Sequence, residues 1–350
     1  MGSAGSVTSA GSRIRYSDLS EPGITRQRRG KGFSYRAPDS TPLTDPAALA
    51  RIKSLVIPPA WKDVWICPDS RGHIQAVGTD SAGRRQYRYH DSWREERDQA
   101  KHDRMLTFGA ALPRLRSVVE AHLEERGLSR NRVLAATVRL IDLGFFRPGG
   151  AEYAADNGTY GLATILREHV TCRRGRVTFD YLAKGSQRRE QVVAEPEVCA
   201  VVASLKRRRG GGDGLLAYRN GAEWHDVTAA DINDYIHEIS EGEFTAKDFR
   251  TWHATVLAAV GLAVSDHAAG TSTARQRAVV RAVREVADYL GNTPAVARGS
   301  YIDPHVIEEY RRGRTVARAL GELGARSDFG ELATEGPVER AVLRLLGAGT

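Results

Sequence analysis

The sequence predicts an α+β protein, with a small antiparallel β-sheet domain at its N-terminus and a larger, mainly α-helical domain behind it. Short segments of alternating polarity, separated by turn residues, occupy the first part of the chain. Further along, apolar residues recur at steps of three and four, which is typical of packed helices. One alternating stretch, His169–Val193, interrupts the helical part and predicts a β-hairpin island. A chain of 350 residues is long enough for two such domains.

The N-terminal part is predicted to comprise a flexible tail over residues 1–20 and a β-rich domain over residues 21–95. Within this domain, Asp45–Ile52 is expected to form a short helix. Asp45 is a suitable N-cap, and Pro46 suits the first helical position because that position needs no N–H donor. The predicted strands and turns that follow are Val64–Cys67, 69–72, His73–Val77 and 80–83.

The larger domain is predicted over residues 96–325, followed by a loop and an amphipathic helix over residues 326–350. A strongly charged, helix-like segment, Asp91–Arg104, is expected to be the hinge between the two domains. Residues 265–273 are expected to form a polar insertion. The helices predicted by apolar periodicity are Leu115–Glu125, Ser129–Leu143, Thr228–Ile239, Phe249–Val264 and 276–290.

Composition argues against several classes of protein. The longest apolar run, Ala254–Val264, is shorter than the roughly 20 residues that a membrane span needs, and we expect neither a membrane helix nor a secretory signal. Cys67, Cys172 and Cys199 are widely spaced and odd in number, which fits a reducing compartment rather than a disulfide scaffold. We find no zinc-site spacing. A net charge of +8 favours a nucleic-acid partner.

One tyrosine, Tyr301, closes the stretch GNTPAVARGSY (Gly291–Tyr301), and cations elsewhere give it a chemical meaning. A tyrosine hydroxyl can attack a phosphodiester and hold the broken strand covalently. Arginines such as Arg147 and Arg250 can bind the phosphate bidentately and stay protonated, while a lysine such as Lys184 can protonate the leaving oxygen. Such a site needs no metal. Taken singly, each of these side chains could equally be an ordinary structural or surface residue.

Several longer motifs occur along the chain: IPPAWKDVWIC (Ile57–Cys67), VGTDSAGRRQYRYH (Val77–His90), AKHDRM (Ala100–Met105), FFRPGGAEYAADNGTYGLATI (Phe145–Ile165), VTFDYLAKG (Val177–Gly185), AKDFRTWHAT (Ala246–Thr255) and GNTPAVARGSY. In order and content they resemble the type IB DNA topoisomerases, in the poxvirus-like and bacterial branch. The resemblance covers about residues 25–325. It implies a β-sheet domain and a helical catalytic domain of the kind shared with tyrosine recombinases.

The resemblance also implies roles for individual residues. Tyr301 would be the nucleophile that forms a 3′-phosphotyrosyl link, Arg147 and Arg250 would bind the scissile phosphate, and Lys184 would be the general acid for the 5′ oxygen. Poxvirus relatives carry a histidine nine residues before the tyrosine, where this chain has Asn292. An asparagine can still donate a hydrogen bond to the phosphate, but it cannot become charged. We therefore expect no titration from this position near neutral pH.

As a member of that family, the protein would relax positive and negative supercoils without ATP, a cofactor or an obligatory metal. Its partner would be double-stranded DNA, held by a monomer that closes around the duplex, in the cytoplasm and associated with the nucleoid. Binding would depend largely on phosphate contacts. The positions expected to contact DNA outside the catalytic set are Arg84, Tyr87, Tyr89, Tyr153 and Lys247.

Two alternatives stay open at this point. A tyrosine recombinase uses much the same chemistry, but it usually has a histidine three residues before the second arginine, where this chain has Lys247. It usually also has a helical DNA-binding domain in place of the GRRQYRY strand region. A non-catalytic DNA-binding clamp on an inactive scaffold is the second alternative. A covalent protein–DNA adduct would separate the enzymes from the inactive clamp, and plasmid relaxation without specific sites would separate topoisomerase from recombinase.

Overall fold

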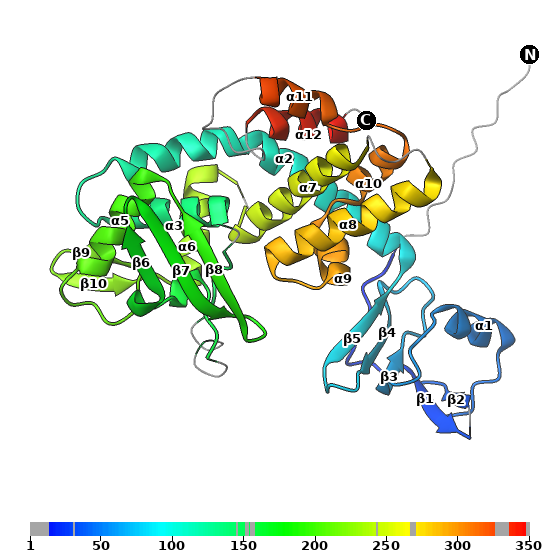
Figure 1. The fold of residues 1–350 in the computed structure, drawn as a ribbon. Helices are drawn as coiled ribbons and strands as arrows, with labels where there is room; N and C mark the ends of the chain where they lie inside the picture. The colour runs from blue at the N-terminus through cyan, green and yellow to red at the C-terminus, as the bar shows by residue number, and fades with distance from the viewer. Residues whose placement is uncertain are drawn as a thin grey trace, which may run out of the picture. The chain divides into compact units, whose positions relative to one another are not determined.

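In the computed structural model the chain divides into two compact units, Met1–His102 and Asp103–Thr350 (Figure 1). The predicted α+β class is confirmed, because the first unit carries an antiparallel sheet and the second is mainly helical with small sheets. No helix in the described part of the chain is long and apolar enough to cross a membrane. The structure describes residues 14–30, 32–144, 146–150, 154, 158–242, 244–266, 271–325 and 336–347.

The first unit is organised around one antiparallel sheet of five strands. Its elements are β1 (Ile24–Arg29), β2 (Gly32–Arg36), α1 (Pro46–Ser54), β3 (Lys62–Ile66), β4 (Ile74–Thr79) and β5 (Arg85–Tyr89). The strand order is β2-β1-β3-β4-β5. Ile24, Ile52, Val64, Ile66 and Ala76 form a small hydrophobic core.

Strands β1 and β2 are regular elements that apolar alternation does not predict, because β1 reads ITRQRR and is mostly charged. Tertiary contacts supply what the pattern lacks. Ile24 lies opposite Ile66 of β3 in the ladder. Arg26 lies over the Phe33 ring at 4.2 Å, and its guanidinium donates to three backbone carbonyl groups of the segment before β3. Burial and pairing therefore override a weak local preference here.

The second unit packs helices around small sheets. Its helices are α2 (Asp91–Leu123), which begins in the first unit, α3 (Arg130–Gly144), α5 (Pro196–Arg207), α6 (Ala229–Ser240), α7 (Ala246–Asp266), α8 (Ser272–Leu290), α9 (Pro294–Val296), α10 (Pro304–Arg311), α11 (Ala317–Ala325) and α12 (Pro337–Gly347). Its strands are β6 (Val170–Arg173), β7 (Arg176–Ala183), β8 (Gln187–Val193), β9 (Ala217–Asn220) and β10 (Glu223–Asp226). Strands β6, β7 and β8 form the predicted island, and β9 pairs with β10.

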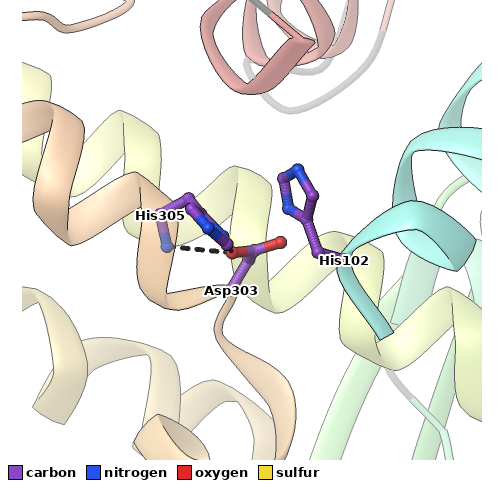
Figure 2. Close-up of side chains that lie close together, drawn as sticks. All are labelled: His102, Asp303 and His305. Atoms are coloured by element: carbon purple, nitrogen blue, oxygen red, sulfur yellow. Dashed lines mark hydrogen bonds and ion pairs between the residues drawn. The ribbon is translucent and has the colours of Figure 1, made fainter. Parts of the chain in front are cut away.

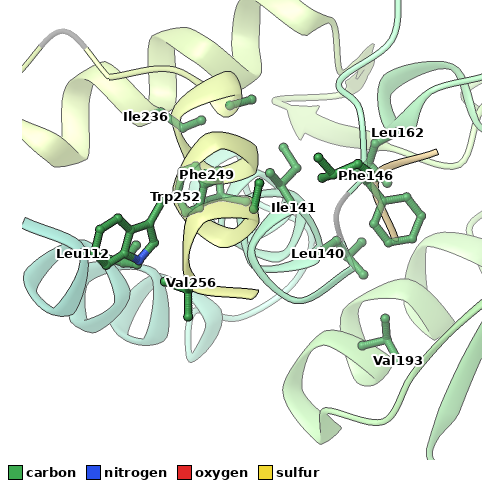
Figure 3. Close-up of a cluster of buried hydrophobic side chains, with 14 of the residues drawn as sticks. Leu112, Leu140, Ile141, Phe146, Leu162, Val193, Ile236, Phe249, Trp252 and Val256 are labelled. Carbon is green, nitrogen blue, oxygen red and sulfur yellow. The ribbon is translucent and has the colours of Figure 1, made fainter. Parts of the chain in front are cut away.

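Helix α7 runs through the core of the second unit. Its residues Phe249, Trp252 and Val256 are fully buried, together with Leu112 of α2 and Ile141 of α3 (Figure 3). The Trp252 ring packs so closely on α2 that a Cβ at Gly109 would lie 2.6 Å from it. Burying a large aromatic side chain stabilises a fold by about 2–3 kcal/mol. The core therefore holds α7, and with it Arg250, in a defined place.

The two segments predicted as the hinge and as Leu115–Glu125 form one helix, α2, which continues through Pro113. The expectation of separate helices was wrong. Proline removes one backbone donor and usually kinks or ends a helix. Here the buried residues Met105, Phe108, Leu112, Leu115 and Val119 follow one another at steps of three and four across the proline. Their continuous burial stabilises the helical path.

The predicted polar insertion at residues 265–273 is mostly helix where the structure describes it. Ser265 lies in the last turn of α7, donates its hydroxyl to the Gly261 carbonyl and accepts a bond from Arg281. Thr271 caps α8 by accepting from the N–H of Ala274. Residues 267–270 lie outside the described residues. Helix α5 and the β9–β10 hairpin are further elements that the sequence did not indicate.

Candidate active site

Arg147 follows α3 on a loop that two glycines hold in place. Gly149 has a φ of +86°, and a Cβ on it would lie 2.7 Å from the Gly161 Cα. A Cβ on Gly161 would lie 2.4 Å from the Gly149 Cα. Only glycine allows backbones to approach this closely. Since the Leu162 N–H also donates to the Arg147 carbonyl at 2.8 Å, the backbone that carries Arg147 is well fixed.

Three arginine side chains gather at the C-terminal end of helix α8. The last carbonyl groups of a helix lack helical partners and carry the negative end of its dipole, so they offset the repulsion among the three cations. Gly291 ends the helix in the left-handed conformation, with φ of 59°. The hydrogen bonds run from Arg147 Nη2 to the Gly291 oxygen (3.0 Å), from Arg250 Nη2 to the Leu290 oxygen (3.0 Å) and from Arg189 Nη1 to the Tyr289 oxygen (2.8 Å).

Arg250, on the first turns of α7, is 3% exposed. Burial lowers the pKa of its guanidinium to about 10, repulsion from Arg147 adds to this shift, and Tyr301 opposes it. Arg250 is thus still protonated at neutral pH. Its Cζ lies 5.4 Å from the centre of the Tyr301 ring. The sequence prediction that Arg250 and the tyrosine come together is therefore met by the geometry.

Asn292 stands directly beyond the end of α8. Its Oδ1 accepts a 2.6 Å hydrogen bond from Arg147 Nη2, and its backbone N–H donates to the Ala287 carbonyl at 2.9 Å. The side-chain Nδ2 is buried, and among the described residues it has no hydrogen-bond partner. A buried donor without a partner costs free energy, so this amide is suited to donate to a ligand oxygen beside Arg147.

Tyr301 ends a π-helical turn, Ala297–Tyr301. The Thr255 hydroxyl of α7 donates to the Tyr301 carbonyl at 3.4 Å and accepts from the Asp303 N–H at 3.1 Å. Asp303 then caps α10, where it accepts from the backbone N–H and the ring Nδ1 of His305 at 2.9 and 2.8 Å (Figure 2). Backbone contacts on both sides thus position the tyrosine next to α7. π-Helical turns are frequent at functional sites.

Lys184 lies in the exposed turn between β7 and β8, as predicted. It lines a cavity of about 160 Å³ together with Arg147, Thr159 and Tyr160. A second, smaller cavity of about 20 Å³ also contains Arg147 and Tyr160, and adds Arg250, Arg189 and Tyr181 to the lining. Arg147 and Tyr160 line both cavities, one of which also contains the lysine and the other the buried arginine. The five predicted catalytic residues thereby occupy one region of the second unit.

The residues predicted to contact DNA outside this region are less gathered. Lys247 is exposed on the first turn of α7 and lines neither cavity. Arg84, in the first unit, is paired with Asp80 at 3.0 Å. Tyr87 and Tyr89 on β5 are 40% and 38% exposed and stack at 6.1 Å between ring centres. Tyr153 lies outside the described residues.

Sequence reasoning missed two side chains of the site. Thr159 is 5% exposed, lines the larger cavity, and its hydroxyl has no hydrogen-bond partner among the described residues. Arg189 lies opposite Tyr181 in the β7–β8 ladder and lines the smaller cavity. Strand alternation could have found Arg189, because Arg188 and Arg189 must point to opposite faces. No comparable signal marks Thr159.

The fold and the site together define a class of protein that acts on a phosphodiester. Guanidinium groups beside a tyrosine side chain are suited to stabilise phosphate charge during nucleophilic attack. Comparisons with known proteins agree. Residues 90–317 match the family model described as eukaryotic DNA topoisomerase I, catalytic core. Residues 32–80 match the model described as bacterial DNA topoisomerase IB, N-terminal domain.

Individual relatives show the same likeness. DNA topoisomerase 1B of Acanthamoeba polyphaga mimivirus is 30% identical over 297 residues, which cover 83% of this chain and 88% of the viral protein. DNA topoisomerase 1B of vaccinia virus (strain Copenhagen) is 20% identical over 235 residues, which cover 66% of this chain and 71% of that protein. The chain belongs to the type IB DNA topoisomerase family.

Proposed function

We propose that Tyr301 is the nucleophile with which this topoisomerase relaxes positive and negative supercoils. Its hydroxyl oxygen attacks the scissile phosphorus, a tyrosine–phosphorus bond forms, and the bond from phosphorus to the 5′ oxygen breaks. Lys184 gives a proton to the departing 5′ oxygen, and the phenolic proton passes to solvent. The free 5′ end swivels about the intact strand. The 5′ hydroxyl then attacks the 3′-phosphotyrosyl link, reseals the strand and restores Tyr301.

Arg147, Arg250 and Asn292 stabilise the charge that develops on the non-bridging oxygens. The single observation that carries the proposal is their convergence at the end of α8, with Arg250 only 5.4 Å from the Tyr301 ring centre. A phosphate oxygen would be a better partner for these cations than neutral carbonyl oxygens, because ionic hydrogen bonds are about twice as strong. The site is thus suited to bind an anion.

Double-stranded DNA is the proposed partner, since family membership implies a DNA-acting enzyme. We propose that residues 21–95 and 96–325 act as a clamp and a catalytic domain around the duplex, and that the protein works as a monomer. Arg84, Tyr87, Tyr89, Tyr153 and Lys247 are the proposed DNA contacts beyond the catalytic set. The cytoplasm, with association with the nucleoid, is the proposed location of the bacterial enzyme, supported by its basic charge of +8.

Relaxation of supercoiled plasmid, with EDTA present and ATP absent, tests the proposed reaction. The protein is expected to relax both positive and negative supercoils, and denaturant is expected to trap a covalent adduct. Tyr301→Phe should bind DNA as the parent protein does, but relaxation and adduct should fall below detection because the hydroxyl nucleophile is gone.

Adduct that persists in Tyr301→Phe would place the nucleophile elsewhere. Intact DNA binding by the parent protein without relaxation would contradict the proposed reaction. In that case, an adduct would favour a recombinase that needs its own sites, whereas no adduct would favour an inactive clamp.

A further inference from the structure

Arg189 is a half-buried cation of the site, and the proposed reaction assigns it no role. It stands on β8, five residues beyond Lys184 and directly opposite Tyr181 of β7. Its neighbour Arg188 points to the other face of the hairpin and pairs with Asp180 there. Arg189 instead points inward and lines the small cavity that Arg147 and Arg250 also line.

The Arg189 guanidinium holds the end of α8. Nη1 donates to the Tyr289 carbonyl at 2.8 Å, and Nη2 donates to the Asp288 carbonyl at 3.3 Å. The group also covers Gly291, where a Cβ would lie 2.0 Å from Nη2. Gly291 thus has two reasons to be glycine, its left-handed φ and this close contact. Two planar N–H donors on two neighbouring carbonyls are a geometry that lysine cannot reproduce.

These contacts join two parts of the site that come from distant segments of the chain. One is the β7–β8 hairpin, whose turn carries Lys184 immediately after β7 and before Gln187. The other is the end of α8, which leads directly to Asn292 and the turn that ends at Tyr301. Within β7–β8, the Ala183–Gln187 and Tyr181–Arg189 pairs belong to one continuous ladder and are separated only by the Leu182–Arg188 pair. The hydrogen bonds of Arg189 to the end of α8 therefore restrain the turn that carries Lys184.

We infer that Arg189 is a positioning residue, which docks the Lys184 hairpin on the end of α8 so that the lysine meets the 5′ oxygen. The inference rests on the proposed role of Lys184 as general acid. Arg147 bonds to Gly291 and Asn292, and Arg250 bonds to the Leu290 carbonyl. Arg189 bonds to the Asp288 and Tyr289 carbonyls, which stand earlier in α8 and farther from Asn292 along the chain. Its effect should therefore pass through the proton donor.

The test compares two leaving groups in single-turnover cleavage. One substrate duplex has the ordinary 5′ oxygen at the scissile bond, and the other has a bridging 5′ sulfur, which departs without needing a proton. Arg189→Ala is expected to slow cleavage of the oxygen substrate by about tenfold or more, since small misplacements of a catalytic group cost this much. On the sulfur substrate, the cleavage rate of Arg189→Ala should stay within about threefold of the parent rate.

A double variant makes the link to Lys184 explicit. If Arg189 acts through the lysine, Arg189→Ala combined with Lys184→Ala should cleave the oxygen substrate no more slowly than Lys184→Ala alone. Arg188→Ala is the matched control, because this neighbouring arginine faces away from the cavity and should leave both rates unchanged. DNA affinity should stay within about threefold in each variant.

Three results would overturn the inference. They are a parent-like rate for Arg189→Ala on oxygen, an equal loss on both substrates, and a double variant slower than Lys184→Ala by the full factor of Arg189→Ala. Thermal unfolding and DNA affinity control for folding, since a misfolded variant would lose both. If the sulfur substrate did not restore the cleavage rate of Lys184→Ala, Lys184 would not be the general acid. The inference about Arg189 would then be wrong as well. The result for Tyr301→Phe would still stand.

Discussion

Asn292 shows how one side chain can set the pH behaviour of a site. Its Oδ1 accepts a hydrogen bond from Arg147 at 2.6 Å, and its buried Nδ2 is suited to donate to a ligand. An amide has no proton to lose or gain near neutral pH. Burial lowers the pKa of Arg250, but only to about 10. Charge at the C-terminal end of α8 is therefore expected to stay constant through the neutral range, where a histidine at position 292 would have titrated.

The Gly149–Gly161 contact is a second place where a single residue controls the site. We predict that Gly161→Ala slows DNA cleavage by at least about tenfold. The new Cβ would lie 2.4 Å from the Gly149 Cα, so the loop must move and take Arg147 with it. Single-turnover cleavage and plasmid relaxation measure the effect, and thermal unfolding reports any accompanying loss of stability.

Gly150→Ala is the matched control for that variant. It stands on the same loop, but a Cβ there would meet nothing within 4 Å among the described residues. Gly150 and Gly161 line the same cavity, so this variant adds a methyl group to the site without the backbone clash, and its cleavage rate should stay within about threefold of the parent rate. If Gly161→Ala cleaved as fast as Gly150→Ala, the close backbone contact would have no part in positioning Arg147.

Several helices of the second unit are joined by one buried ionic network centred on Asp142 of α3. Arg116 of α2 donates to Asp142 at 2.8 Å and also pairs with Glu339 of α12. His253 of α7 lies 2.8 Å from the same carboxylate, one turn beyond Arg250. Trp252 donates to Glu339 at 2.9 Å. The network ties α12 to α7, the helix that carries Arg250.

We predict that Asp142→Asn destabilises the protein by about 3 kcal/mol, because removing one member of a buried pair leaves charges uncompensated. Burial would raise the pKa of the Asp142 carboxyl, but hydrogen bonds from His253 and Arg116 outweigh it and hold the pKa well below the ordinary 3.8. The unfolded chain therefore binds the extra proton first, and this stabilisation, complete above pH 4, is lost as the pH falls toward the folded pKa.

Urea unfolding at neutral pH and between pH 5 and 2 measures both effects. The stability of Asp142→Asn should fall less steeply with acid than that of the parent. Glu322→Gln is the control, since Glu322 belongs to an exposed pair with Arg318 and should change stability by under about 0.5 kcal/mol. Parallel acid curves for Asp142→Asn and the parent would rule out a depressed pKa at Asp142.

At the element scale, sequence prediction succeeded where periodicity and capping are local. Thr228 caps α6 with Asp231 in a capping box, and the β7–β8 hairpin places Lys184 in its turn. Prediction failed where contacts between residues far apart in the sequence determine the secondary structure. The buried stripe across Pro113 and the pairing of β1 with β3 cannot be read from nearby residues. Thr159 joined the candidate site only through folding, since nothing around it in the sequence marks it.

The whole molecule is basic, but only part of its positive charge is exposed on the surface. With Lys and Arg totalling 51 against 43 for Asp and Glu, the net charge is +8. Many arginines are used internally, such as Arg26 against backbone carbonyls and Arg116 against buried carboxylates. The cations that remain exposed, Lys247 among them, are those available to neutralise DNA phosphates. Binding to duplex DNA should then release counterions in proportion to the phosphates contacted.

This reasoning gives a salt dependence that can be measured. With Tyr301→Phe as a non-cleaving background, the logarithm of the binding constant should fall linearly with the logarithm of salt concentration, by about 0.9 per phosphate contacted. Lys247→Ala in that background should make the slope shallower by about 0.9, because one contact is lost. Arg318→Ala is the control, since this arginine is 94% exposed and paired with Glu322. A slope for Lys247→Ala equal to that of Arg318→Ala would show that Lys247 contacts no phosphate in the complex.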